Sequence, residues 1–199
     1  MEYKNKFKNI FDEYKKYYEC IFDVFYPSKN STGFTERNLS VNFSKAYEKL
    51  NPKAITWFEF QFGEKNNLHY DALIINRETK ELFLIESKRF SNLDKKVNEV
   101  QNDIIRIKEA ITIYNSDFES RIPQFNDYTI YGIILTDVWT ESKGKIAIKE
   151  SFENEVFTEK YFSHKLPEIA YFTQSFNKPN PYIQTLKNYY LTSFVWKVS

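Results

Sequence analysis

Apolar residues recur at three- and four-residue intervals in three parts of the chain, residues 1–26, 35–50 and 91–114. This spacing places apolar side chains along one side of an α-helix and leaves polar residues on the other. Pro27 and Pro52 follow the first two segments and end their helices, because proline cannot continue one. The pattern therefore predicts three amphipathic helices.

Between the second and third of these helices, the pattern changes to a period of two. Residues 57–62 alternate, so their three phenylalanines are expected to share one face of a β-strand. Residues 70–76 and 81–88 form two further apolar segments, and the polar tetrad 77–80 between them is typical of a hairpin loop. Residues 128–136, rich in β-branched and aromatic side chains, predict a fourth strand.

The length of 199 residues favours a single domain. Residues 35–137 are expected to form its core, in the order helix, three strands, helix, strand. Residues 1–30 are then a helical N-terminal extension. Residues 138–199 are a C-terminal extension with weaker signals, among them a short strand at 146–149. A loop near residues 177–181 precedes a final helix or strand. The fold expected is an α/β fold with a sheet flanked by helices.

Composition narrows the possible classes of protein. The 28 Lys and Arg residues against 27 Asp and Glu give a formal charge of +1, so any site for a polyanion must be local. The single cysteine, Cys20, cannot form an intrachain disulfide, and no apolar run approaches the length of a membrane span. We expect a cytoplasmic protein without a membrane segment. With only two histidines, zinc chemistry is disfavoured.

The chemistry is concentrated on the hairpin of residues 70–88. If its loop spans residues 77–80, Asn76 faces Glu81, and counting outward brings Asp71 opposite Glu86 on the same face. The period of two adds Lys88 to that face. Two opposed carboxylates repel each other unless a cation bridges them, and oxygen ligands favour a hard ion. The sequence therefore predicts a Mg²⁺ site, with Mn²⁺ able to substitute.

Counting across the preceding loop, residues 63–67, brings Glu59 opposite Asp71. Glu59 is then either a member of the same acidic row or a solvent-facing carboxylate on an alternating strand. A shift of one residue in the register would turn it to the other face. Both readings stay open.

Asp71, a gap of 14 residues, and then Glu86-Ser87-Lys88 resemble the signature of the PD-(D/E)xK nuclease superfamily, the fold of many restriction endonucleases. The order of elements in residues 35–137 is similar as well. The resemblance implies a three-layer restriction-endonuclease-like fold with a mixed central sheet. It makes Asp71 and Glu86 metal ligands, adds the Ser87 carbonyl as a third ligand, and gives Lys88 the task of positioning or activating the attacking water.

The resemblance also implies a function, a Mg²⁺-dependent endonuclease acting on DNA in restriction, defence or repair, with RNA not excluded as substrate. A homodimer is expected, because cutting both strands generally needs two sites. Tyr70 stands where the name of the motif has proline. Many members carry an acidic residue on the helix before the sheet, and some a glutamine on the next helix. Glu36 and Gln101 match these positions, or are an ordinary first-turn glutamate and a solvated helix residue.

Other readings compete with the nuclease. Asp71, Glu86 and Lys88 could form a salt bridge on a hairpin surface, or the fold could be a noncatalytic nucleic-acid-binding or interaction module. The best candidates for phosphate contacts are the N-terminal lysines, which are Lys4, Lys6, Lys8, Lys15 and Lys16. The basic residues of the third helix, Lys95, Lys96, Arg106 and Lys108, alternate with acidic ones and are read as a solvated face. C-terminal aromatic residues are read as packing rather than base stacking: Tyr182, Tyr189, Tyr190, Phe194 and Trp196.

Overall fold

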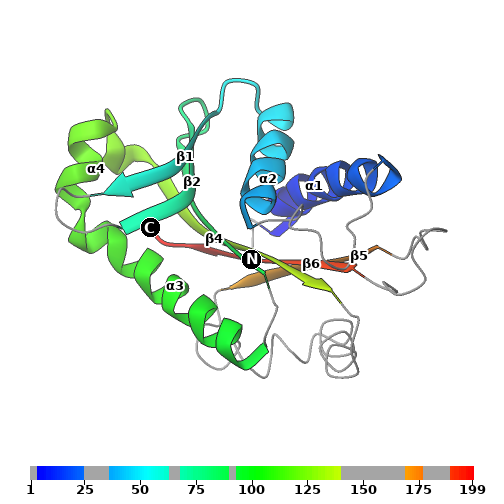
Figure 1. Cartoon of the computed structure of the whole chain (residues 1–199). Coiled ribbons are helices and arrows are strands. Elements are labelled where there is room, and N and C mark those ends of the chain that lie inside the picture. The colour runs from blue at the N-terminus through cyan, green and yellow to red at the C-terminus, as the bar shows by residue number, and fades with distance from the viewer. Residues whose placement is uncertain (1–3, 25–35, 63–67, 90–92, 140–168, 177–188) are drawn as a thin grey trace.

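The computed structural model describes residues 4–24, 36–62, 68–89, 93–139, 169–176 and 189–199 (Figure 1). The expected strand at 146–149, the loop at 177–181 and Tyr182 lie outside these residues.

Six strands form one open sheet in the order β1-β2-β3-β4-β6-β5. They are β1 (Ile55–Phe62), β2 (Leu68–Asn76), β3 (Glu81–Arg89), β4 (Thr129–Trp139), β5 (Ala170–Phe176) and β6 (Tyr189–Lys197). The sheet is mixed, because β3 and β4 run parallel while the other neighbouring strands are antiparallel. The helices are α1 (Lys4–Val24), α2 (Glu36–Leu50), α3 (Leu93–Ile113) and α4 (Asn115–Arg121), with a 3-10 turn at Phe125–Asp127.

Helices cover both faces of the sheet, so the α/β prediction is confirmed (Figure 1). The apolar stripe of α3 packs on one face together with Phe118 of α4. Helices α1 and α2 pack on the other face, where Phe7, Phe11 and Phe43 are fully buried. Each such side chain contributes about 1.5–3 kcal/mol when it is buried, so both faces are held by apolar packing. The helix α4 and the 3-10 turn, which follow α3, are elements that the sequence did not predict.

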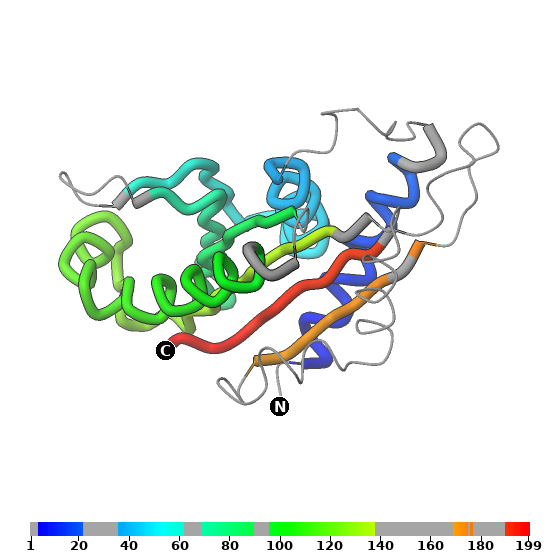
Figure 2. Tube along the Cα trace, turned by 60° about the horizontal axis from the view of Figure 1, so that its bottom comes forward, coloured from blue at the N-terminus to red at the C-terminus, as the bar shows by residue number. Residues whose placement is uncertain are grey.

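The terminal segments belong to this same folded unit. Helix α1 runs beside β5 (Figure 2), where the Phe11 and Phe172 rings stack with their centroids 4.6 Å apart. The final segment is a strand, β6, between β4 and β5, and its Tyr190, Phe194 and Trp196 are buried as the sequence predicted. The strand β5 had no sequence signal.

Gly132 on β4 lets the Trp196 ring pack directly against the backbone of the neighbouring strand. A Cβ atom at Gly132 would lie 2.2 Å from the Trp196 ring, so only glycine leaves room for the indole.

The predicted hairpin register is confirmed for β2 and β3. The recorded pairing runs from Asn76↔Glu81 to Ala72↔Ile85 and ends there. Asp71 and Glu86 are the next residues of the two strands, and their direct pairing stays a prediction. The predicted register of β1 and β2 is also found, with Phe58↔Ala72 on one side of Glu59 and Phe60↔Tyr70 on the other.

The expected common face of the phenylalanines in β1 is wrong for Phe58 and Phe60. Phe58 packs with the core under α1 and α2, whereas Phe60 packs with the core under α3 and α4. The cause is Glu59, whose φ of 52° lies in the left-handed region. This backbone rotation reverses the side-chain alternation between the two halves of the strand without shifting the register.

Candidate functional site

The candidate site lies at the carboxyl end of β3, where the strand carries polar side chains. Glu86 and Lys88 face α3, and the Lys88 ammonium lies 4.0 Å from a Glu86 carboxylate oxygen. Glu86 is only 3% exposed, although it is ionisable. The alternation of β3 therefore places the carboxylate and the ammonium side by side, as the sequence predicted.

Asp71 joins the site from β2, the neighbouring strand. Its Oδ2 atom accepts a hydrogen bond of 2.6 Å from the backbone N–H of Ser87. This bond ties Asp71 to the Glu86-Ser87-Lys88 segment. Burial raises the pKa of Asp71, and the Ser87 hydrogen bond and the Lys88 charge counteract this only in part.

Two charged residues of α3, Asp103 and Arg106, complete the cluster. Asp103 is 7% exposed and lies 3.2 Å from the Lys88 ammonium. The Arg106 guanidinium pairs with Glu86 Oε1 and lies 2.9 Å from Asp103 Oδ1. It also lies over the Tyr70 ring, 5.5 Å from the centroid. The reading of Arg106 and Asp103 as part of a solvated face is therefore wrong.

A sequence signal for these residues does exist. Lys96, Glu99, Asp103 and Arg106 follow one another at intervals of three, four and three residues. They thus form a polar row alongside the apolar stripe of α3, at the position from which a helix residue reaches the sheet. Lys96 is part of this row, because its ammonium lies 2.7 Å from Glu99 and 3.6 Å from Glu36. It too is only 19% exposed.

The cluster contains more carboxylates than cations, because Asp71, Glu86 and Asp103 lie with only Lys88 and Arg106. Burial raises the pKa of Glu86 to about 8, and the nearby charges of Asp71 and Asp103 add to this shift, while Arg106 and Lys88 oppose it. Burial alone would lower the pKa of Lys88, but the charges of Asp103 and Glu86 raise it above its ordinary value. Titratable groups perturbed in this way gather at functional sites more often than elsewhere.

Glu36, the predicted acidic residue of the preceding helix, reaches the same end of the sheet. It is the first residue of α2, and its Oε1 atom accepts a hydrogen bond of 2.9 Å from the backbone N–H of Arg89. Its charge also helps to raise the pKa of Lys88. Arg89 in turn lies 3.4 Å from the buried carboxylate of Asp137 on β4. The structure therefore brings Glu36 close to Lys88.

The other auxiliary residues are less closely tied to this cluster. Glu59 is exposed, and its charge contributes to the raised pKa of Asp71, so it lies near the acidic row without a hydrogen bond to it among the contacts described. Gln101 is half-buried on α3, and its part in the site stays a prediction.

Three of the N-terminal lysines make ion pairs within the chain. Lys6 pairs with Glu81, Lys16 lies 3.0 Å from Glu13, and Lys15 lies 3.8 Å from Glu19. Lys4 and Lys8 are exposed. Glu81 begins β3, so Lys6 lies at the end of the sheet opposite to Glu86, about 17 Å away at the usual rise of a strand. Nucleic-acid binding by these lysines stays a prediction.

The resemblance implies a Mg²⁺ ion, and the donor atoms at the candidate site decide whether the residues fit it. Within the described residues, no three His, Cys, Asp or Glu side chains are grouped so as to hold a metal ion. The candidate site thus has two carboxylates, Asp71 and Glu86, and the backbone of Ser87 between Glu86 and Lys88. Oxygen donors of this kind suit Mg²⁺, which usually takes one or two carboxylates and keeps several waters. The residues therefore fit the ion.

Comparison with protein-family models, with curated proteins and with solved structures finds no match to this chain. In the part of the chain that is described, no helix has the length and apolar character needed to cross a membrane.

Proposed function

We propose that this protein has a restriction-endonuclease-like fold and is a Mg²⁺-dependent nuclease that hydrolyses phosphodiester bonds of DNA. The observation that carries the proposal is the hydrogen bond between Asp71 of β2 and the Ser87 backbone of β3. Asp71 is hydrogen-bonded to the segment that carries Glu86 and Lys88, so two carboxylates and an ammonium converge from neighbouring strands. The order α2, β1, β2, β3, α3, α4, β4 contains the expected helix, three strands, helix and strand with α4 added, and it supports the proposal together with the position of Glu36.

In this proposal, Asp71, Glu86 and the Ser87 carbonyl hold the ion. A bound Mg²⁺ would polarise the phosphoryl oxygen and lower the pKa of an attacking water. Lys88 is held by Asp103 at 3.2 Å, and paired carboxylates favour its charged ammonium form. Its role is therefore to orient the water and to place positive charge where negative charge develops in the transition state. Asp103 fixes the Lys88 side chain in that position.

The proposal is tested by incubating supercoiled plasmid and single-stranded DNA with the protein and Mg²⁺ or Mn²⁺. Wild type is compared with Lys88→Ala and with a matched control, Lys53→Ala, which removes an exposed lysine paired with Glu78. We expect metal-dependent cleavage that EDTA and Lys88→Ala abolish and Lys53→Ala leaves unchanged. Cleavage by Lys88→Ala at the wild-type rate would refute the assignment of Lys88. Absence of cleavage by wild type with either ion would count against the nuclease.

A second candidate function is a noncatalytic nucleic-acid-binding module with the same fold. One observation favours it, the ion pair of Arg106 with Glu86, because a permanent arginine partner would satisfy a carboxylate that no longer binds metal. Such a module would bind Mn²⁺ weakly and be indifferent to Asp71→Asn. The nuclease is preferred, because Asp71, Glu86 and Lys88 are all present and in contact with one another or with a common neighbour.

A further inference from the structure

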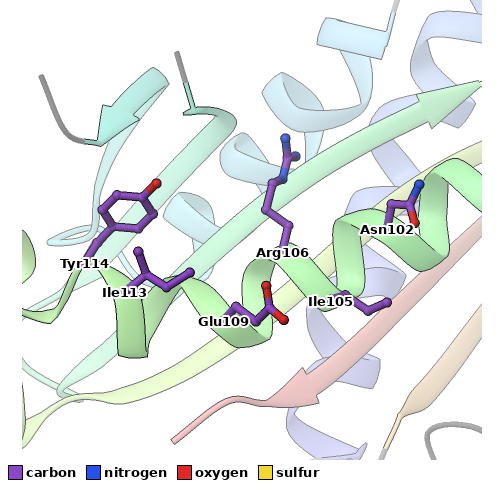
Figure 3. Close-up of a pocket in the computed structure, with 6 residues that line it drawn as sticks. All are labelled: Asn102, Ile105, Arg106, Glu109, Ile113 and Tyr114. Carbon is purple, nitrogen blue, oxygen red and sulfur yellow. The ribbon is translucent and has the colours of Figure 1, made fainter. Parts of the chain in front are cut away.

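The Arg106 guanidinium occupies the Glu86 carboxylate, which is one of the proposed ligands of the metal ion. The guanidinium pairs with Glu86 Oε1, and Asp103 Oδ1 lies 2.9 Å away on the same helix. Figure 3 shows the Arg106 side chain extending from α3, while Ile105 and Glu109 lie along the helix itself. The side chain is 32% exposed, so it has room to turn towards solvent.

A metal ion and Arg106 compete for Glu86. A divalent ion held by Asp71 and Glu86 would use a lone pair of the same carboxylate and would repel the nearby guanidinium. Asp103 is a second partner, and the Tyr70 ring lies under the guanidinium. Arg106 can therefore leave Glu86 and stay tethered to Asp103, without becoming a buried cation with no partner.

The charge balance of the cluster indicates where Arg106 would turn. In their ordinary ionised forms, Asp71, Glu86 and Asp103 together with Lys88 and Arg106 carry one net negative charge. One divalent ion makes this set positive by one charge, and one phosphodiester would neutralise it. A guanidinium released from a carboxylate can bind phosphate oxygens with the same forked geometry.

We propose that Arg106 holds Glu86 in the metal-free protein and turns to a phosphate of the nucleic acid when a divalent ion takes its place. The inference rests on the proposed nuclease function and adds to it a residue that couples the binding of metal to the binding of substrate. Coupling of this kind is reciprocal, so the metal should strengthen nucleic-acid binding through Arg106.

The first test is Mn²⁺ binding measured by calorimetry without nucleic acid. Arg106→Met should tighten Mn²⁺ binding about tenfold, the size expected when a charge-assisted hydrogen bond no longer competes. The matched control is Arg121→Met, since Arg121 also lies over a ring, Phe60 at 5.9 Å, but donates to the Gln61 carbonyl. It should leave Mn²⁺ affinity unchanged, and Asp71→Asn should abolish binding. If a folded Arg106→Met variant binds Mn²⁺ with unchanged or weaker affinity, the inference is overturned but the proposed nuclease function is not.

Failure of the proposed function would look different. If wild type binds no Mn²⁺ and Asp71→Asn has no effect, the nuclease and the inference both fall, and Arg106 is the permanent partner of Glu86. A measurement on wild type avoids any folding defect of the variant. In an NMR titration with Mg²⁺, the side-chain N–H signal of Arg106 should shift while that of Arg121 does not. An Arg106 signal that stays in place at saturating Mg²⁺ would overturn the inference.

The second test is DNA binding measured by fluorescence anisotropy, with Ca²⁺ in place of Mg²⁺ to hold back hydrolysis. In EDTA, wild type and Arg106→Met should bind a short duplex equally. With Ca²⁺, wild type should bind more tightly and Arg106→Met should bind about tenfold more weakly than wild type, the loss of one charged contact. An equal gain from Ca²⁺ in both proteins would contradict the transfer of Arg106 to phosphate.

Discussion

Strand β3 carries a buried glutamate at its start and another near its end, and the two have different surroundings. Glu81 is 5% exposed and accepts hydrogen bonds from neutral and cationic donors on separate elements. Lys6 of α1 donates to Oε1, while Thr79 Oγ1 at 2.7 Å and Tyr47 Oη at 3.4 Å donate to Oε2. Both oxygens therefore have protein partners.

Glu86 is equally buried but lies among other carboxylates. Asp71 and Asp103 raise its pKa in addition to burial, and only Arg106 and Lys88 oppose them. A protein interior tolerates an ionised carboxylate when donors surround it, as they do at Glu81. The two glutamates therefore differ in their partners: donors surround Glu81, whereas Glu86 lies among carboxylates, and the proposed function assigns only Glu86 to the metal site.

The largest expected effect separates the two glutamates by activity. Glu86→Gln should lower metal-dependent plasmid cleavage at least about 100-fold, because the proposed ligand of the ion loses its charge. Glu81→Gln should leave the cleavage rate within a factor of about two, since Glu81 is at the opposite end of the strand. Initial nicking rates at saturating Mg²⁺ measure both. Equal losses in the two variants would erase the distinction.

The difference should also appear in the pH dependence of stability. The folded pKa of Glu86 is raised to about 8 from 4.5, so between these values the folded state binds a proton that the unfolded state has lost. Its contribution to stability is therefore complete below pH 4.5 and is lost as pH rises towards about 8. Since one pKa unit corresponds to about 1.4 kcal/mol, the loss is at most about 5 kcal/mol.

The measurement is urea unfolding in EDTA at several pH values, comparing wild type with Glu86→Gln. The variant cannot titrate at this position, so its free energy of unfolding should fall less between pH 5 and 8. Asp71, whose pKa is raised in the same direction, interacts with Glu86, so the difference between the two proteins reports the coupled titration of this pair. Parallel curves for the two proteins would show that Glu86 is ionised throughout this range.

The register of the strands was predictable from the sequence, because a polar loop of four residues fixes the pairing of a hairpin. Counting outward from residues 77–80 gives Asn76↔Glu81, and the partnership of Asp71 with the Glu86 segment follows. The same argument predicted the register on both sides of Glu59. The register could be predicted because it depends on local chain geometry, which the alternation of side chains along a strand and the length of the hairpin loop determine.

The features that were missed depend on tertiary packing. A left-handed φ at Glu59 has no sequence signal, since glycine or asparagine usually occupies that conformation. The side chains of Asp103 and Arg106 reach Glu86 and Lys88 only because α3 crosses the sheet at that point. The spacing of the polar row on α3 places these residues at the edge of the apolar stripe, but it does not identify the groups that they contact on the sheet.

The third prediction concerns the start of β3. Glu81→Gln should lower the free energy of unfolding by about 1–3 kcal/mol, because Lys6 loses its charged partner and the polar groups around Glu81 are buried. Urea unfolding at pH 7 measures the loss. A matched control is Glu78→Gln, an exposed glutamate that pairs with Lys53 and should change stability little. Equal effects of the two substitutions would show that the network around Glu81 contributes no more than a surface pair.

The smallest expected effect is that of Tyr47→Phe, which removes one hydroxyl from the same network. Tyr47 Oη accepts from Asn76 Nδ2 at 3.2 Å and donates to Glu81 at 3.4 Å, a long and therefore weak bond. The ring keeps its edge-on contact with Phe83 at 4.7 Å in the variant. Burial raises the pKa of Tyr47 to about 12, so the hydroxyl stays protonated and the effect should not vary between pH 6 and 9.

We expect Tyr47→Phe to lose about 0.5–1.5 kcal/mol in urea unfolding, the usual net value of a neutral hydrogen bond. Plasmid cleavage should be unchanged, because Tyr47 lies with Glu81 at the far end of β3 from Lys88. A loss of cleavage with normal stability would mean that the two ends of the strand are coupled. The assignment of stability to one end of the strand and of the proposed activity to the other would then no longer hold, because removal of the hydroxyl beside Glu81 would act on Glu86 through the strands or helix that join the two ends.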